Sequence, residues 1–260
     1  MIDIKTPEQV QAMQEGGKIL SDVLWAVCAA VKPGVSELEL DALAEKMIRE
    51  RGGEPGFMRV PGYHHTLCIC TNDVVVHGIP RSYQLQVGDV VDFDGGVFYK
   101  GFHTDMCETI RVANGELRME NSEEQNDINT FLVTGKRALE EAIKVAKGGN
   151  RIGHISQVIQ DIVEKEGGYS VVRNLIGHGV GRELHEDPEV PGYLDRPIAK
   201  TPLLKPGMTI AIEVIYNMGR PDVVYNGTDD WTIVTKDGSL SAVFERSVAI
   251  TAGAPIVLTP

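Results

Sequence analysis

The chain lacks the features of a disulfide-bonded, membrane-spanning or nucleic-acid-binding protein. Only four cysteines occur in 260 residues, and none has C-x-x-C spacing, so neither a disulfide framework nor a zinc ribbon is indicated. No apolar run approaches the ~20 residues of a membrane span, and the N-terminus does not resemble a signal peptide. The net charge of −12 argues against tight nucleic-acid binding. We therefore expect a cytoplasmic protein with reduced thiols and neither membrane nor direct nucleic-acid partners.

An internal duplication is visible in the helical segments. Residues 31–53 align without gaps on residues 146–168, and a Lys-x-Gly break precedes an amphipathic stretch in both. Each half is predicted to contain a first helix (16–31 and 133–146), the break, a second helix and strands ending in a hairpin. The polar stretch 113–127 is predicted to be a solvated connection and helix start.

The fold expected from this duplication is α+β. We predict one domain over residues 1–260, with pseudo-repeat halves of approximately 1–112 and 128–260. Two α+β halves related by a pseudo-twofold axis would place their sheets side by side. Helices would then cover one face of an antiparallel sheet, and acidic residues would occupy the other.

One segment reads as two strands around a tight turn and carries Asp94 and Asp105. A turn centred on 99–100 would place these residues opposite each other, with Cβ atoms about 4.5–5.5 Å apart. A turn at 100–101 would shift the pairing by two and still leave both on one face. Adjacent carboxylates resist ionising together, and Asp92 shares the face, so we predict a cation there.

The second half supplies more candidate ligands. Glu213 is the only charge in an apolar run of strand length, where an unpaired carboxylate is costly to bury. Residues 231–250 read as another hairpin, with Glu245 in the returning strand. A glycine-rich loop presents His178 and His185. Four carboxylates and one imidazole suit a pair of divalent ions ~3.5–4 Å apart, bridged by carboxylates and water.

In order and spacing, these residues closely resemble the type I methionine aminopeptidases, which have the pita-bread fold. The resemblance runs almost end to end, through segments 4–8, 31–36, 72–80, 230–232 and 239–245. It implies a methionyl aminopeptidase, a dinuclear metallo-exopeptidase that hydrolyses the N-terminal methionine from nascent proteins and peptides with a small second residue. It also implies a monomer that works near the ribosome with two divalent ions, which could be Mn, Fe, Co or Zn.

The resemblance also implies a role for each ligand. Asp94 would chelate one ion, while His178 and Glu213 would bind the other. Asp105 and Glu245 would bridge the two ions.

Three residues would be catalytic by the same resemblance. Glu213 would shuttle a proton from water to the departing amine, and His185 would stabilise the tetrahedral oxyanion. His77, which on its own reads as a structural histidine at a strand end, would bond the scissile amide. Substrate contacts would come from His77, His185, Tyr63, Cys68 and Trp231.

The expected substrate pocket departs from the family at four positions. Val60 stands at a usual tyrosine, His64 at a usual proline, Leu184 where phenylalanine is common, and Gly96 where threonine is frequent. An apolar slot for a thioether remains, and we expect it to be wider than usual.

The other histidines are expected outside the site. We predict a surface loop for His64 and His65 and a surface position on a helix for His154. We predict that His103, which alternates with Asp105, lies behind the ligands or is solvated.

Two rival functions are a Xaa-Pro aminopeptidase or prolidase-like peptidase and a non-enzymatic pita-bread binding protein. The first shares the fold and a similar ligand set, but the glycine-rich histidine loop fits the methionine enzymes better. Binding proteins of this fold typically lose ligands, and all five candidate ligands are present here.

Overall fold

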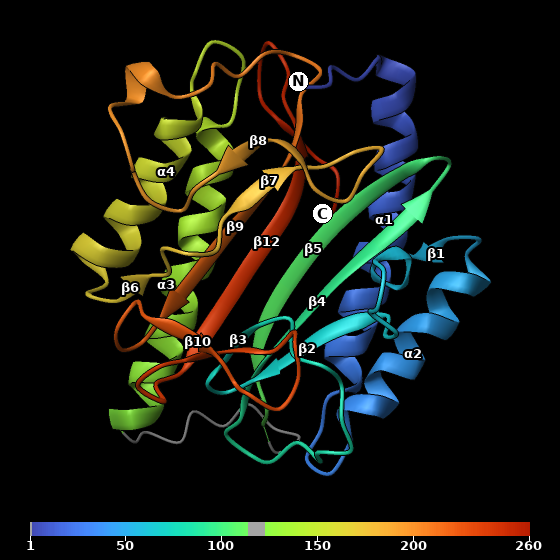
Figure 1. Cartoon of the computed structure of the whole chain (residues 1–260), viewed down its shortest axis with the longest axis vertical. Coiled ribbons are helices and arrows are strands. Elements are labelled where there is room, and N and C mark those ends of the chain that lie inside the picture. The colour runs from blue at the N-terminus through green and yellow to red at the C-terminus, as the bar shows by residue number, and fades with distance from the viewer. Residues whose placement is uncertain (1, 114–122) are drawn as a thin grey trace.

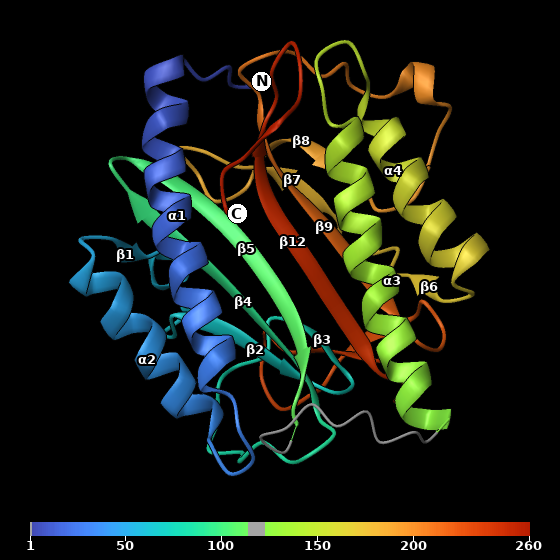
Figure 2. The ribbon, with the colours of Figure 1, turned by 180° about the vertical axis from the view of Figure 1, so that it is seen from behind.

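The computed structural model of the protein describes residues 2–113 and 123–260 (Figure 1). In this part of the chain, a ten-stranded sheet is accompanied by a three-stranded sheet. The helices pack on one face of the large sheet, as Figure 2 shows from behind. No helix of the described residues is both long and apolar enough to cross a membrane. Of the predicted connection 113–127, residues 114–122 lie outside the described residues, and the helix start predicted in this stretch is confirmed, because a helix begins at Glu123.

The helices are α1 (Pro7–Ala30), α2 (Glu37–Glu50), α3 (Glu123–Val145) and α4 (Ile152–Gln160), which continues as a π-helical turn over Asp161–Glu166. The predicted starts of α1 and α3, at 16 and 133, are therefore wrong by about ten residues. For α1 the missed signal is a capping box, in which Thr6 and Gln9 satisfy each other's backbone N–H groups, with Pro7 at the first helical position between them.

The duplication is preserved in the backbone. Helices α2 and α4 each begin three residues after a left-handed glycine, Gly34 or Gly149, both with φ of 90°. The helical segments end one residue apart in the alignment, at Glu50 and at the π-helical Glu166. The left-handed glycine that follows is accordingly Gly52 in the first half and Gly168 in the second. The π-helical turn holds one residue more than an α-helical turn and accounts for this shift.

The large sheet joins the two halves. Its order is β1-β4-β5-β12-β9-β7-β8, with β2 also on β4, β6 on β9 and β13 on β12. Its strands are β1 (Glu54–Pro55), β2 (Leu67–Thr71), β4 (Val90–Tyr99), β5 (Phe102–Arg111), β6 (Ser170–Val171), β7 (Gly177–Gly179), β8 (Glu186–Val190), β9 (Thr209–Asn217), β12 (Ser241–Ala249) and β13 (Ile256–Val257). Strands β5 and β12 pair at the centre (Figure 1), so we propose that residues 1–260 fold as one unit.

The β4–β5 hairpin has the later of the two predicted turns. Lys100 and Gly101 have φ of 49° and 85°, as two-residue hairpin turns require. Asp105 therefore lies opposite Gly96, while Asp94 lies opposite Cys107. The pairing based on a turn at 99–100 is wrong, and the alternative that keeps both carboxylates on one face is confirmed.

The prediction of a hairpin over residues 231–250 is wrong. Strand β11 (Ile233–Thr235) pairs with β3 (Val74–Val76) and β10 (Val223–Tyr225) in the small sheet, while β12 pairs with β5 and β9 in the large one. A turn does form at Gly238, where φ is 73°. The backbone groups of the two strands find partners in different sheets, so the chain crosses between sheets at this turn.

The apolar core lies between helices and large sheet in two main clusters. One contains Leu20, Leu24 and Phe93 from the first half, and the other contains Phe131 and Phe244 from the second. Each cluster is buried by its own helix pair, which leaves the opposite face of the sheet available for polar residues. The α+β architecture predicted from the sequence, an antiparallel sheet with helices on one face, is confirmed.

Candidate metal centre and substrate pocket

The five predicted ligands come from neighbouring strands. Cross-strand pairing places Glu213 on β9 opposite Glu245 on β12, Glu245 opposite Cys107 on β5, and Cys107 opposite Asp94 on β4. Residues that pair directly point to the same face of a sheet. Asp105 shares this face because it lies two residues from Cys107, and His178 joins from β7 at the far side of β9.

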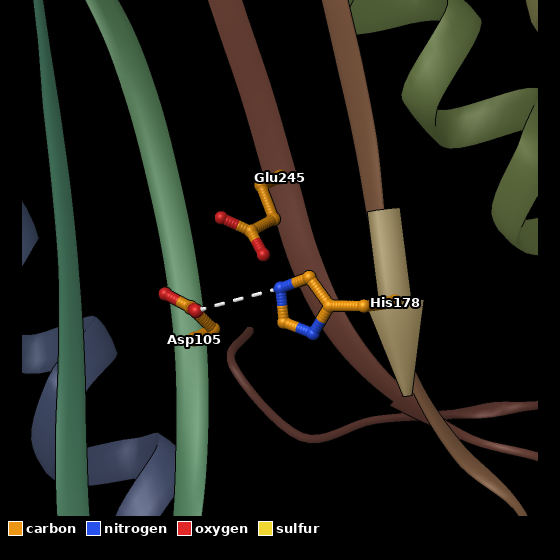
Figure 3. A group of neighbouring side chains, drawn as sticks. All are labelled: Asp105, His178 and Glu245. Atoms are coloured by element: carbon orange, nitrogen blue, oxygen red, sulfur yellow. Dashed lines mark ion pairs between the residues drawn. The ribbon is translucent and has the colours of Figure 1, made fainter. Parts of the chain in front are cut away.

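The side chains of Asp105, His178 and Glu245 converge (Figure 3). One ligand atom from each lies within 4.8 Å of the others, a spacing that allows all three to bind one ion. The Nε2 atom of His178 is 3.9 Å from Oδ2 of Asp105 and 3.3 Å from Oε1 of Glu213. Asp94 and Glu213 line the same pocket.

The His178 ring is held in a suitable orientation. Its Nδ1 lies 2.8 Å from the carbonyl oxygen of Gly179 and donates to it, which directs Nε2 toward the carboxylates. Ligating histidines commonly use one ring nitrogen in this way and present the other to the metal.

The electrostatics of the cluster call for a cation. Burial raises the pKa of the Asp94 and Glu245 carboxyls well above the usual range, and the charge of Asp105 raises both further. Burial also raises the pKa of Asp105 to about 7. Oδ1 of Asp94 and Oε1 of Glu245 are buried without a hydrogen-bond partner among the described residues. Such oxygens are costly unless they bind a cation, and carboxylates with one imidazole suit a divalent transition-metal ion.

An apolar pocket of about 150 Å³ opens above these ligands. Tyr63 and Trp231 form part of its wall, with ring centroids 5.2 Å apart and planes at 69°. The Tyr63 hydroxyl donates to the Leu67 carbonyl oxygen at 2.8 Å, which fixes the ring. Cys68 and Leu184 complete this part of the wall. All three side chains predicted to contact the substrate besides the histidines therefore line the pocket.

Two of the four departures from the family line the pocket, and a third, Gly96, lies behind the pocket residue Phe57. Val60 and Leu184 line it directly, whereas His64 is exposed and is not among the lining residues. A Cβ atom at Gly96 would lie 3.1 Å from Cε1 of Phe57, so the Phe57 ring occupies the space that a larger residue at 96 would need.

The two histidines predicted to be catalytic also line the pocket. His77 has a left-handed backbone with φ of 57°, an unusual conformation for a non-glycine residue that is enriched at functional sites. Burial lowers the pKa of His77. His185 is exposed at the pocket, and its ring centroid is 4.3 Å from that of His178. Desolvation, and to a smaller extent the charge of the neighbouring His178, lowers the pKa of His185. Both shifts favour the neutral form of the ring at pH 7.

The remaining histidines are partly as predicted. His64 is exposed. His65 lies in the same loop and is half-buried, with its Nδ1 3.2 Å from Oδ2 of Asp41, a carboxylate that also accepts hydrogen bonds from the adjacent backbone. His103 is buried beside Phe98, with centroids 4.8 Å apart, so it is not solvated. His154 is partly buried and accepts from the Arg151 N–H at 3.0 Å.

Some pocket residues were not predicted. Cys107 and Phe57 line the site, and so does Asp92, which was placed only on the ligand face. Cys107 could have been found from its alternation with Asp105 along the strand. Phe57 lies in a short 3₁₀ turn, and no periodic signal marks it.

Comparison with known proteins agrees with this site. Residues 11–252 match the model of metallopeptidase family M24. The chain is 41% identical to a methionine aminopeptidase of Clostridium perfringens over 100% of its own length and 99% of that protein. It is 39% identical to methionine aminopeptidase 1 of Bacillus subtilis over 96% of each.

Solved structures extend the comparison. The crystal structure of a methionine aminopeptidase from Thermotoga maritima superposes with a TM-score of 0.91 at 35% identity, covering 100% of this chain and 99% of that one. A prolidase from Pyrococcus furiosus has a TM-score of 0.73 at 23% identity, with 99% of this chain and 65% of the prolidase covered, and this similarity shows the fold alone. The chain therefore belongs to metallopeptidase family M24, with the methionine aminopeptidases.

Proposed function

We propose that the protein is a methionyl aminopeptidase that hydrolyses the N-terminal methionine from nascent proteins and peptides with a small second residue. The observation that carries this proposal is the cluster of four carboxylates and one imidazole at an apolar pocket of about 150 Å³. The pocket suits an unbranched apolar side chain, and its sulfur can contact the Tyr63 and Trp231 rings. The full-length relatives named methionine aminopeptidase support the same assignment.

The proposed cofactor is a pair of divalent ions, Mn, Fe, Co or Zn. Asp94, Asp105, His178, Glu213 and Glu245 would hold them, because these residues offer buried carboxylate oxygens and one oriented imidazole nitrogen. When bound, such ions supply a nucleophilic water at neutral pH and polarise the scissile carbonyl.

The remaining steps belong to side chains of this protein. Glu213, whose Oε1 is 3.3 Å from Nε2 of His178, would carry a proton from the attacking water to the departing amine. His185, neutral and unprotonated on one nitrogen, would donate its single ring N–H to the developing oxyanion. His77 would bond the scissile amide. Tyr63, Cys68 and Trp231 would hold the methionine side chain.

The setting of the reaction is part of the proposal. We propose that the enzyme is a cytoplasmic monomer that meets nascent chains near the ribosome through their N-terminal peptides. The net charge of −12 supports recognition of the peptide instead of direct binding to ribosomal RNA.

The direct test is hydrolysis of Met-Ala-Ser compared with Xaa-Pro peptides after removal of metal and addition of Mn²⁺, Fe²⁺, Co²⁺ or Zn²⁺ separately. Release of methionine from Met-Ala-Ser is expected, with little cleavage of Xaa-Pro. Preferred cleavage of Xaa-Pro would support the prolidase-like alternative. Absence of any cleavage with every metal would support a binding protein.

A further inference from the structure

The loop that carries His185 is held from outside the pocket. This loop connects β7 to β8 and lies between Gly179 and Glu186, which pair with each other across the ladder. Its first part is tied to the large sheet, because the His103 N–H donates to the Gly181 carbonyl oxygen at 2.6 Å. Among the described residues no hydrogen bond restrains the His185 ring itself. The position of that ring therefore depends on the backbone of the loop.

Glu186 closes the other end of the loop. Its Oε1 accepts the Glu183 N–H at 3.1 Å, and its carboxylate pairs with the Lys5 ammonium. The Glu186 side chain is only 13% exposed. Without a cation, this carboxylate would be left largely desolvated with the Glu183 N–H as its donor. Turning toward water would then lower its free energy.

Lys5 is held in place beside this carboxylate by several contacts. Its side chain is 1% exposed, and its Nζ is also 3.3 Å from Oδ2 of Asp3. Its own N–H donates to the Gly207 carbonyl oxygen at 2.7 Å. The backbone approaches closely there, because a Cβ atom on Gly207 would lie 2.8 Å from the Lys5 carbonyl oxygen. A side chain at Gly181 would collide with the Lys5 methylene and ammonium groups.

We propose that Lys5 is a positioning residue that fixes the His185 loop through its ion pair with Glu186. The pair joins the N-terminal segment of the first half to a loop of the second. Lys5 itself does not touch the pocket, because it is absent from the residues that line it. The inference rests on the proposed peptidase function only for its kinetic consequence; the restraint of the loop is independent of the reaction.

The first test measures the loop without catalysis. In metal-free protein, Lys5→Met should speed hydrogen exchange of the Glu183 amide by at least about tenfold, because the Lys5–Glu186 ion pair no longer opposes local opening of the loop. Lys100→Met is the matched control, since Lys100 also pairs with a distant glutamate, Glu15, at 2.6 Å but lies on the β4–β5 turn. Unchanged exchange at Glu183 in Lys5→Met, or an equal increase in Lys100→Met, would overturn the proposal.

The second test uses turnover of Met-Ala-Ser by metal-loaded enzyme. Lys5→Met should lower kcat by roughly 10–10², the cost of a misplaced catalytic group, with KM changed by less than about threefold and metal content unchanged. In a His185→Ala background the same substitution should lower kcat by less than about threefold, because its effect passes through His185. An equal loss in both backgrounds would show a general structural role and reject the proposal.

Two outcomes separate the positioning role from other failures. If wild-type enzyme does not cleave Met-Ala-Ser, the proposed function fails, while the exchange experiment still decides the restraint. If Lys5→Met does not fold, Glu186→Gln replaces it, because glutamine keeps one acceptor oxygen for the Glu183 N–H and removes the negative charge that pairs with Lys5. Glu186→Gln should then show the same kcat loss with unchanged metal content, and normal kcat would reject the pairing as the cause.

Discussion

His178 should make the stability of the metal-free protein fall as pH rises from 6.5 to 8.5. Burial alone lowers the pKa of His178, but the hydrogen bond and charge of Glu213 outweigh it and raise the pKa to about 9. An unfolded histidine has a pKa near 6.5. The folded state therefore keeps a proton that the unfolded state loses. This contribution is fully present below pH 6.5 and is lost as pH rises through about 9.

The size of the effect follows from these two values. Between pH 6.5 and 8.5 the lost contribution is about 2 kcal/mol, which corresponds to a fall in Tm of roughly 4–8 °C for a protein of this length. Asp105 acts in the same direction only up to pH 7, since burial raises its pKa from 3.8 to about 7. Burial lowers the pKa of His103 and that of His185 to about 4, so the opposite contributions of these two histidines are largely complete by pH 6.5.

Calorimetry of chelator-treated protein across this pH range measures the slope. His178→Asn should make the slope shallower without abolishing it, because the raised pKa of Asp94 and of Glu245 acts in the same direction, whereas His154→Gln, on helix α4, should leave the slope unchanged. Added Mn²⁺ or Co²⁺ should reverse it, because a metal displaces the His178 proton and binds more tightly as pH rises. A Tm of metal-free wild type that is constant or increases from pH 6.5 to 8.5 would refute the pairing of His178 with Glu213.

Three further predictions concern activity. Asp105→Ala and Glu245→Ala should each abolish Met-Ala-Ser hydrolysis, because a carboxylate that bridged the two proposed ions would serve both, and elemental analysis should show reduced metal; full activity of either variant would contradict a dinuclear site. His185→Ala should retain metal but lower kcat by roughly 10²–10³, as for loss of one oxyanion donor, and metal loss in this variant would instead make His185 a ligand. Leucine and norleucine should compete with methionine on a Xaa-Ala-Ser series, since such pockets separate neighbouring homologues by only ~1–3 kcal/mol; Val60→Tyr should sharpen selectivity, and a preference of wild type for leucine would contradict this view of the pocket.

The sequence contained most of the information that places the candidate ligands. Alternation along strands puts Asp94, Asp105 and Cys107 on one face whichever turn the hairpin adopts. The exact pairing could not be chosen, because turns at 99–100 and 100–101 both bury the same residues. The choice depends on backbone conformation, since Lys100 must enter the left-handed region. This conformation costs energy for a lysine, and the ten-pair β4–β5 ladder offsets that cost.

Long-range partners were harder to predict than strand alternation. The segment containing Trp231 and Glu245 has the local pattern of a hairpin, with turn residues between apolar runs. Its two strands instead satisfy their backbone groups in different sheets, because β3 offers an edge to β11 and β5 and β9 surround β12. The same limitation applies to Lys5 and Glu186, whose pairing spans 181 positions and has no local pattern.

The position of the site follows from the way the two halves join. Strand β5 contributes Asp105 from the first half and β12 contributes Glu245 from the second, and these strands pair at the centre of the sheet. A shift of one residue in this pairing would turn Glu245 toward the helices and remove it from the ligand cluster. The nine-pair β9–β12 ladder resists such a shift. Because neither half contains the whole set of ligands, correct pairing of β5 with β12 is itself a requirement for the proposed metal site.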